Sequence, residues 1–265
     1  MLTYIASYPR CGNAWIRSLI ILNWRYLVAN GYPDDWNKTV ETGAKYKICA
    51  PESKDAIPRH ARTLLRSHIA QYTNPLTGEI RYTLKPSALE LMVDDNRRML
   101  AESEHRYFLK THDMPFDRFF EGESVVQIVR HPGAALASFC RLEGAFGETD
   151  GQIPQLHHFI RGRTAYGDWS DYHRRWRDAD VPTLRVRFED GKRNEMEMAS
   201  QIGGFLGFDQ PPTIIDFFNE RHTANPARNP HGSIDRWRED FDQEALELLQ
   251  SCHGDEGAIH GYDIM

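Results

Sequence analysis

The first 30 residues change from an apolar run to a helical spacing of apolar positions. Residues 2–7 are mainly apolar and rich in strand formers, and they end at a Pro-Arg-Cys-Gly turn. After Ala14, apolar side chains recur every three to four residues until Asn30-Gly31 and Pro33 end the pattern. The recurring residues are Trp15, Leu19, Leu22 and Tyr26. The sequence therefore predicts a strand, a glycine-containing turn and a helix, which form the first half of a βαβ unit.

Patterns farther along the chain predict more elements of both kinds. The expected strands are residues 107–110, 124–129 and 183–188. The expected helices are residues 86–100, 134–141 and 195–206, the last closed by Gly207. The rest of 35–105 has weak periodicity, and we expect it to form a variable layer over the sheet. No repeat or linker interrupts the chain, so the sequence predicts one three-layer α/β domain over residues 1–265, with a mainly parallel sheet.

Charge and cysteine content exclude several classes of protein. With 32 Lys and Arg against 38 Asp and Glu, the net charge of −6 argues against nucleic acid as a partner. No apolar run approaches the about 18 residues of a transmembrane helix, and the segment from Leu2 lacks the basic flank of a signal peptide. The four cysteines are far apart and form no CxxC pair. We therefore expect no membrane partner, no zinc site, no disulfide framework and a cytoplasmic location.

The turn between the first strand and the first helix has the features of an anion site. Unpaired N–H groups at the start of a helix, together with the helix dipole, attract an anion. Gly12 allows a close approach of the backbone, and Arg10 adds a permanent positive charge. The GxxxxGK[ST] spacing of nucleotide-binding P-loops is absent, which disfavours a kinase or NTPase.

Two other strand ends carry candidate chemistry. Arg130 follows an apolar strand, and Ser138 lies eight residues later on the next helix, so the pair offers a cation and a hydroxyl to an anion. The alternative is an ion-paired arginine and a surface serine. His112 ends the segment Lys110-Thr111-His112, and a histidine with a pKa near 6.5 can act as a general base. The alternative is a structural histidine.

Taken together, these segments resemble the soluble sulfotransferases that use 3′-phosphoadenosine 5′-phosphosulfate (PAPS). Residues 7–15, Lys110-Thr111-His112, and Arg130 with Ser138 correspond in order to three motifs of that family. Further matches in the same order are residues 159–169, His173, Trp176, residues 187–190, Gly232, Trp237, Phe241 and residues 261–262. The resemblance covers nearly the whole chain and implies the PAPS sulfotransferase fold, with a P-loop-like strand, turn and helix.

The resemblance also implies a reaction and a set of site residues. A sulfuryl group moves in line from PAPS to a hydroxyl or amine of a small-molecule acceptor, and adenosine 3′,5′-bisphosphate (PAP) is released without a metal. His112 is the implied base, while Arg10 and Lys110 neutralise charge near the 5′-phosphosulfate. Trp15 and Phe188 sandwich or flank the adenine. The implied donor-binding residues are Arg10, Cys11, Gly12, Asn13, Ala14, Trp15, Arg130, Ser138, Phe188, Arg228, His231 and Gly232.

Several residues depart from the family pattern. Cys11 and Ala14 stand where Ser and Thr are usual, so backbone N–H groups and Asn13 are expected to carry more of the contact with the 5′-phosphosulfate. The Cys11 thiol is either a reactive group at a helix start or a buried, inert replacement for Ser. Pro230-His231-Gly232 replaces the usual Arg-Lys-Gly, and Arg228 or His231 is the expected substitute at the 3′-phosphate.

Two alternatives to a sulfotransferase stay open. One is a nucleotide kinase or NTPase, which would depend on Mg²⁺. The other is a non-catalytic PAP-binding protein, which the lost hydroxyls and the lost Arg-Lys-Gly would suit. Lys110 and His112 are retained, and this favours the enzyme. Acceptor specificity is expected in the segments 35–105 and 142–158, which would lie over the site.

Overall fold

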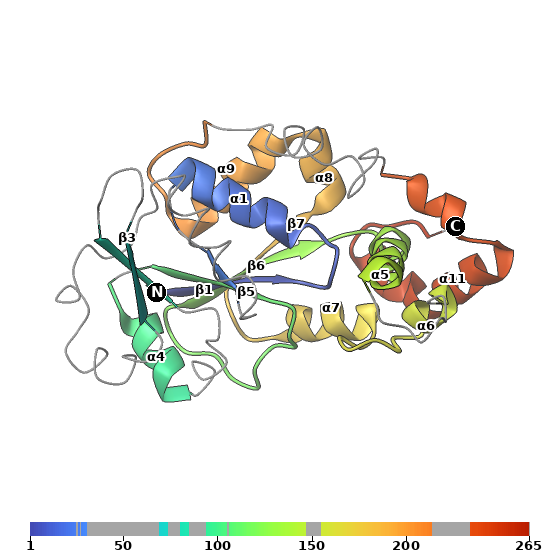
Figure 1. Cartoon of the computed structure of the whole chain (residues 1–265), viewed down its shortest axis with the longest axis horizontal. Helices are drawn as coiled ribbons and strands as arrows, with labels where there is room; N and C mark the ends of the chain where they lie inside the picture. The colour runs from blue at the N-terminus through green and yellow to red at the C-terminus, as the bar shows by residue number, and fades with distance from the viewer. Residues whose placement is uncertain are drawn as a thin grey trace.

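The computed structural model of the chain describes residues 1–24, 26, 28–30, 69–73, 80–84, 94–104, 106–146, 155–213 and 234–264. Within these ranges, five strands form a sheet in which every neighbouring pair is parallel (Figure 1). Their spatial order is β2 (Val28–Asn30), β5 (Tyr107–Thr111), β1 (Leu2–Ser7), β6 (Glu123–Val129) and β7 (Thr183–Arg187). A separate antiparallel pair consists of β3 (Ile69–Thr73) and β4 (Ile80–Leu84). The predicted α/β class with a parallel sheet is confirmed.

Helices lie on both faces of the parallel sheet. Figure 1 shows α1, α8 and α9 on one face and α4 and α7 on the other, with α5, α6 and α11 grouped beyond one end of the strands. The helices are α1 (Asn13–Trp24), α4 (Asp94–Glu102), α5 (Pro132–Phe146), α6 (Leu156–Ile160), α7 (Trp169–Asp178), α8 (Phe188–Arg193), α9 (Glu195–Leu206), the 3₁₀ helix η4 (Arg236–Asp240) and α11 (Gln243–Ile259).

The central strands are buried because helices cover both sides of the sheet. Every residue of β1, and every residue of β6 except Ser124, is buried. Helix α1 adds Trp15, Ile16 and Leu19 to the same core. The apolar run at residues 2–7 and the helical spacing after it therefore build the centre of the molecule, as the pattern predicts.

Some predicted boundaries are wrong. Helix α1 ends at Trp24, so Tyr26 lies outside it. The Tyr26 ring stacks on Phe208 with a centroid distance of 5.2 Å, which explains why the apolar spacing in the sequence continues beyond the end of the helix. The helix predicted over 86–100 is α4, which starts at Asp94, and residues 85–93 lie outside the described ranges. The strand predicted over 183–188 ends at Arg187, because Phe188 begins α8.

The predicted elements do not include α7 and α11, although α7 has a helical stripe of buried residues. Trp169, Tyr172, His173 and Trp176 are buried at a spacing of three, four and seven residues from the first. Helix α11 packs against this region. No helix in the described part of the chain is long and apolar enough to cross a membrane.

Candidate functional site

Three strands end next to one another, and the sequence-predicted site residues follow these ends. In the register of the sheet, Ala6 of β1 pairs with Thr111 of β5 and with Gln127 of β6. The loop after β1, His112 after β5 and Arg130 after β6 therefore lie along one edge. This edge, outside the carboxyl ends of the strands, is where open α/β sheets bind ligands.

Hydrogen bonds link the three segments directly. Arg10 Nε donates to Ser138 Oγ of α5 over 3.0 Å, and Arg130 Nη1 donates to the carbonyl oxygen of Arg10 over 2.9 Å. His112 Nδ1 lies 2.6 Å from the carbonyl oxygen of Ser7. Residues that are far apart in the sequence are thus joined into one site around the loop after β1.

The loop itself has an unusual backbone. Arg10 has a φ of 67°, a left-handed conformation that costs free energy for a side chain other than glycine. Gly12 has a φ of 105°, and a Cβ added there would lie 2.8 Å from Cδ2 of Phe188. The carbonyl oxygen of Gly12 accepts from the N–H groups of Trp15 and Ile16, which starts α1. Glycine is therefore required at position 12 for both conformation and space.

The Cys11 thiol is fully buried in the hydrophobic core. Its side chain has no exposed surface. Burial raises the pKa of the thiol to about 12, more than Arg130 and Arg10 lower it. The burial and the raised pKa favour the interpretation of Cys11 as a buried replacement for Ser over that of a reactive thiol at the helix start.

The side chain of Asn13 is directed to β1. Its Nδ2 donates to the carbonyl oxygen of Ile5 over 2.8 Å and to Ser7 Oγ over 3.2 Å. Both acceptors of the Asn13 amide group therefore lie in β1. This does not agree with the expectation that the Asn13 side chain contacts the donor's 5′-phosphosulfate. Ala14 is exposed and brings only its backbone N–H to the loop.

The geometry around His112 defines which ring nitrogen carries the proton. A distance of 2.6 Å between Nδ1 and the carbonyl oxygen of Ser7 is attractive only if Nδ1 donates, because two lone pairs would repel each other. The neutral ring therefore has its lone pair on Nε2. Burial, and then the charge of Lys110, lower the pKa of His112 to about 3. The edge of the ring contacts Tyr166, with centroids 5.7 Å apart.

Positive side chains gather around the site. Lys110 and Arg17 both lower the pKa of His112 by charge repulsion. Burial and repulsion from Arg130 lower the pKa of Lys192 on α8. An anion bound among these groups would relieve their mutual repulsion.

The guanidinium of Arg130 has one buried nitrogen, Nε, without a hydrogen-bond partner among the described residues. Its guanidinium lies over the ring of Phe188, with Cζ 4.5 Å from the ring centroid, and burial lowers its pKa. A buried charged group with an unused N–H is costly, and this observation points to an anionic ligand.

Trp15 and Phe188 contact each other directly. Their ring centroids are 5.4 Å apart at an interplanar angle of 74°, and both side chains are nearly buried. The Trp15 indole Nε1 also donates to Glu195 Oε1. Because the edge-to-face contact leaves no space for a third ring, the expected sandwich around adenine is not formed here. A flanking contact with one ring edge stays a prediction.

The sequence reasoning missed a cluster that ties the C-terminus to the site. The buried carboxylate of Glu189 accepts from the N–H of His131 over 3.0 Å and from the hydroxyl of Tyr262 over 2.7 Å. His131 stacks on Trp237 with centroids 4.4 Å apart. The family-like segments 187–190 and 261–262 were the available signal, but only the fold shows that they meet beside Arg130.

Three predicted donor residues, Arg228, His231 and Gly232, lie outside the described residues. In the part of the chain that the structure describes, no group of three or more His, Cys, Asp and Glu side chains could hold a metal ion.

Comparison with known proteins gives a family and a fold. The sequence profile of a family described as Sulfotransferase domain matches residues 3–256. No curated protein sequence matches the chain. The solved structure of mouse sulfotransferase SULT7A1 complexed with PAP has a TM-score of 0.54 and 12% identity, and the match covers 97% of this chain and 84% of that one.

A second similar structure is that of retinol dehydratase in a complex with retinol and PAP. It has a TM-score of 0.52 and 16% identity, with 97% of this chain and 81% of that chain covered. At such identities the similarity to solved structures shows the shared fold.

Proposed function

The chain belongs to the sulfotransferase domain family, and on this basis we propose that it transfers the sulfuryl group of PAPS to a hydroxyl or amine of a small-molecule acceptor. PAPS supplies the sulfuryl group and is released as PAP. The observation that carries the proposal is the meeting of Arg10, Arg130 and a neutral His112 at the ends of three parallel strands. The PAP bound in two solved structures of the same fold supports it.

The site residues fit a donor with two anionic ends. The N–H groups of the loop after β1 and the side chain of Arg10 would hold the 5′-phosphosulfate. Arg130 and Ser138 would hold the 3′-phosphate, with Arg228 or His231 as further candidates. The buried Nε of Arg130, which has no hydrogen-bond partner among the described residues, supports this assignment.

His112 would act as the base at Nε2. As the bond between sulfur and the acceptor oxygen forms and the bond between sulfur and the bridging oxygen breaks, the acceptor proton would move to Nε2. A positioned base contributes roughly 10²–10⁴-fold to such a step. The negative charge of a bound donor would oppose the repulsion from Lys110 and Arg17, and would thereby raise the pKa of His112.

Arg10 and Lys110 would stabilise the leaving side of the reaction. Negative charge grows on the bridging oxygen as it separates from sulfur, and preorganised cations lower the free energy of that state. The contacts that hold Arg10 at the site include its own donation to Ser138 and the donation from Arg130 to its carbonyl oxygen. Such fixed placement avoids the cost of reorganising the charges during the reaction.

The experiment compares nucleotides and then turnover. PAP should raise the melting temperature, whereas ADP, with or without Mg²⁺, should raise it far less. Incubation with PAPS and a mixture of hydroxyl-bearing and amine-bearing acceptors should then release PAP and sulfated products. Equal stabilisation by Mg²⁺ and ADP would favour the kinase alternative, and PAP binding without any turnover would favour a non-catalytic binding protein.

A further inference from the structure

The side chain of Asn13 connects the start of α1 to the residue that contacts the proposed base. Asn13 Nδ2 donates to Ser7 Oγ over 3.2 Å, and Ser7 Oγ lies 3.3 Å from His112 Nδ1. Both Asn13 and Ser7 are buried. Asn13 is therefore connected to the imidazole through one side chain, that of Ser7. Its other hydrogen bond, to the carbonyl oxygen of Ile5 at 2.8 Å, ties the start of α1 to β1.

The orientation of the Asn13 amide is determined by its neighbours. If the amide were flipped, its Oδ1 would face the carbonyl oxygen of Ile5, and the two oxygens would repel each other. In the observed orientation, Oδ1 is buried and has no hydrogen-bond partner among the described residues. Burying Oδ1 without a hydrogen-bond partner costs free energy, and the two donations to β1 fix the orientation of the amide.

The donation from Asn13 makes Ser7 Oγ an acceptor on the side of α1. His112 Nδ1–H can then lie between two acceptors of the same residue, the carbonyl oxygen at 2.6 Å and Oγ at 3.3 Å. Asn13 holds Ser7 in the position that presents both acceptors to Nδ1. Without Asn13, Ser7 loses this anchor and its carbonyl oxygen can move away from Nδ1. The imidazole proton can then occupy Nε2, which is the nitrogen that must accept the acceptor's proton.

We propose that Asn13 is a positioning residue, which acts through Ser7 to keep the proton of His112 on Nδ1, rather than a ligand of the donor's phosphate. This inference rests on the proposed role of His112 as the base. It gives the loop two separate tasks: backbone N–H groups and Arg10 face the donor, while the Asn13 side chain faces the base.

The test reads the tautomer of His112 in the free protein by long-range ¹H–¹⁵N correlation on histidine-labelled samples, with the His112→Ala spectrum as the assignment. The wild-type spectrum should show the Nδ1–H tautomer. Asn13→Ala should move His112 toward the Nε2–H tautomer and lower turnover about tenfold, with the Kd of PAP changed by less than about twofold. An unchanged His112 spectrum in Asn13→Ala would overturn the proposal.

Asn23→Ala is the matched control. Asn23 also lies on α1, ten residues after Asn13, and its amide is also hydrogen-bonded, with Nδ2 donating to the carbonyl oxygen of Leu19 and Oδ1 accepting from the N–H of Thr213. This variant should lose similar stability and keep the wild-type His112 spectrum. A changed spectrum in Asn23→Ala would mean that loss of stability alone disturbs His112, and the proposal would fail.

Ser7→Ala tests the route of the effect. It removes the hydroxyl through which Asn13 anchors Ser7 and keeps the carbonyl oxygen, so Ser7→Ala should move His112 toward the Nε2–H tautomer as Asn13→Ala does, and the Asn13→Ala/Ser7→Ala double variant should move it no further. A Ser7→Ala variant with the wild-type His112 spectrum would exclude the route through Ser7 Oγ. The spectrum needs no turnover, so a protein that transfers no sulfuryl group would refute the proposed function without affecting this result.

Discussion

The guanidinium of Arg130 donates to the carbonyl oxygen of Arg10 over 2.9 Å, so the cation that follows β6 also supports the left-handed turn that follows β1. This contact uses one side of the guanidinium, while Nε stays buried without a partner among the described residues. Arg130 is thereby both a fixed part of the loop and a group with capacity for an anion.

Arg130→Ala should weaken PAP far more than a nucleotide without the 3′-phosphate. Hydrogen bonds to charged groups contribute about 1.5–3 kcal/mol, roughly 10- to 150-fold in affinity. Calorimetric titration should show a loss in this range for PAP and little change for adenosine 5′-phosphosulfate. Equal losses of affinity for the two nucleotides would mean that Arg130 only supports the loop, and would assign it a purely structural role.

Gly12→Ala should damage both the fold and the donor site. The new Cβ would meet Phe188 at 2.8 Å, and a φ of 105° costs a residue with a side chain on the order of 1–3 kcal/mol. Thermal denaturation should show a clear loss. Gly204→Ala is the control: no atom lies within 4 Å of its added Cβ, and alanine in the helix α9 should stabilise by about 0.5–1 kcal/mol. Equal behaviour of the two variants would contradict the described loop.

Tyr262→Phe should weaken PAP binding although Tyr262 does not contact the loop after β1. The hydroxyl donates to Glu189, whose other oxygen accepts from the N–H of His131, the residue after Arg130. Loss of this bond leaves a buried carboxylate partly unsatisfied, which costs about 1–3 kcal/mol in stability. Urea denaturation and PAP titration measure the two effects. An unchanged Kd for PAP would show that the C-terminal cluster does not position Arg130.

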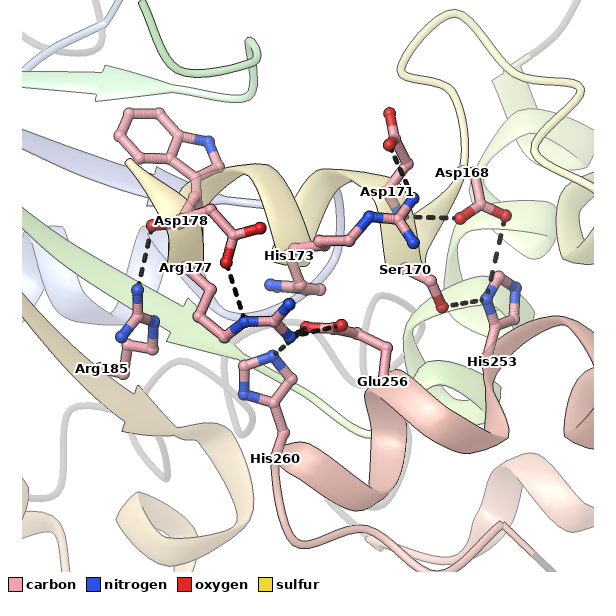
Figure 2. Close-up of polar contacts among 12 residues, drawn as sticks. Asp168, Ser170, Asp171, His173, Arg177, Asp178, Arg185, His253, Glu256 and His260 are labelled. Atoms are coloured by element: carbon pink, nitrogen blue, oxygen red, sulfur yellow. Dashed lines mark hydrogen bonds and ion pairs between the residues drawn. The ribbon is translucent and has the colours of Figure 1, made fainter. Parts of the chain in front are cut away.

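The stability of the fold should fall as the pH drops below about 6.5, the unperturbed pKa of histidine. Figure 2 shows His173, His253 and His260 between α7 and α11, and burial lowers the pKa of each below its usual value. Asp168 and Glu256 oppose this shift, whereas Arg177 and Arg185 add to it at His260. The unfolded chain then binds protons that the native state does not, so each such group lowers the free energy of unfolding by up to about 1.4 kcal/mol per pH unit.

Denaturation at pH 7.5 and at pH 5.5 measures this dependence, and His173→Gln provides the comparison. His173 is fully buried, and its Nδ1 faces the amide of Gln127 at 3.1 Å. Removing it should reduce the slope between the two pH values. A free energy of unfolding that rises toward pH 5.5 would mean that these histidines are protonated in the native state.

The sequence predicted those parts of the fold that are determined within a single helix or strand. The buried β1 and the helix α9, closed by Gly207 at a φ of 64°, follow directly from apolar spacing and from a glycine stop. The placement of Cys11 and of the Asn13 amide could not be predicted, because it depends on which side of the loop faces the core. The contact between Glu189 and Tyr262 needs two segments that only the packed sheet brings together.

His112→Ala, assayed for PAP release from PAPS with a mixture of acceptors, tests the central claim most directly. We predict that turnover falls by at least about 10²-fold while the Kd of PAP stays nearly unchanged, because the imidazole serves the acceptor proton and not the donor. Turnover at the wild-type rate, or a loss of PAP binding as large as the loss of turnover, would contradict the assignment of His112 as the base.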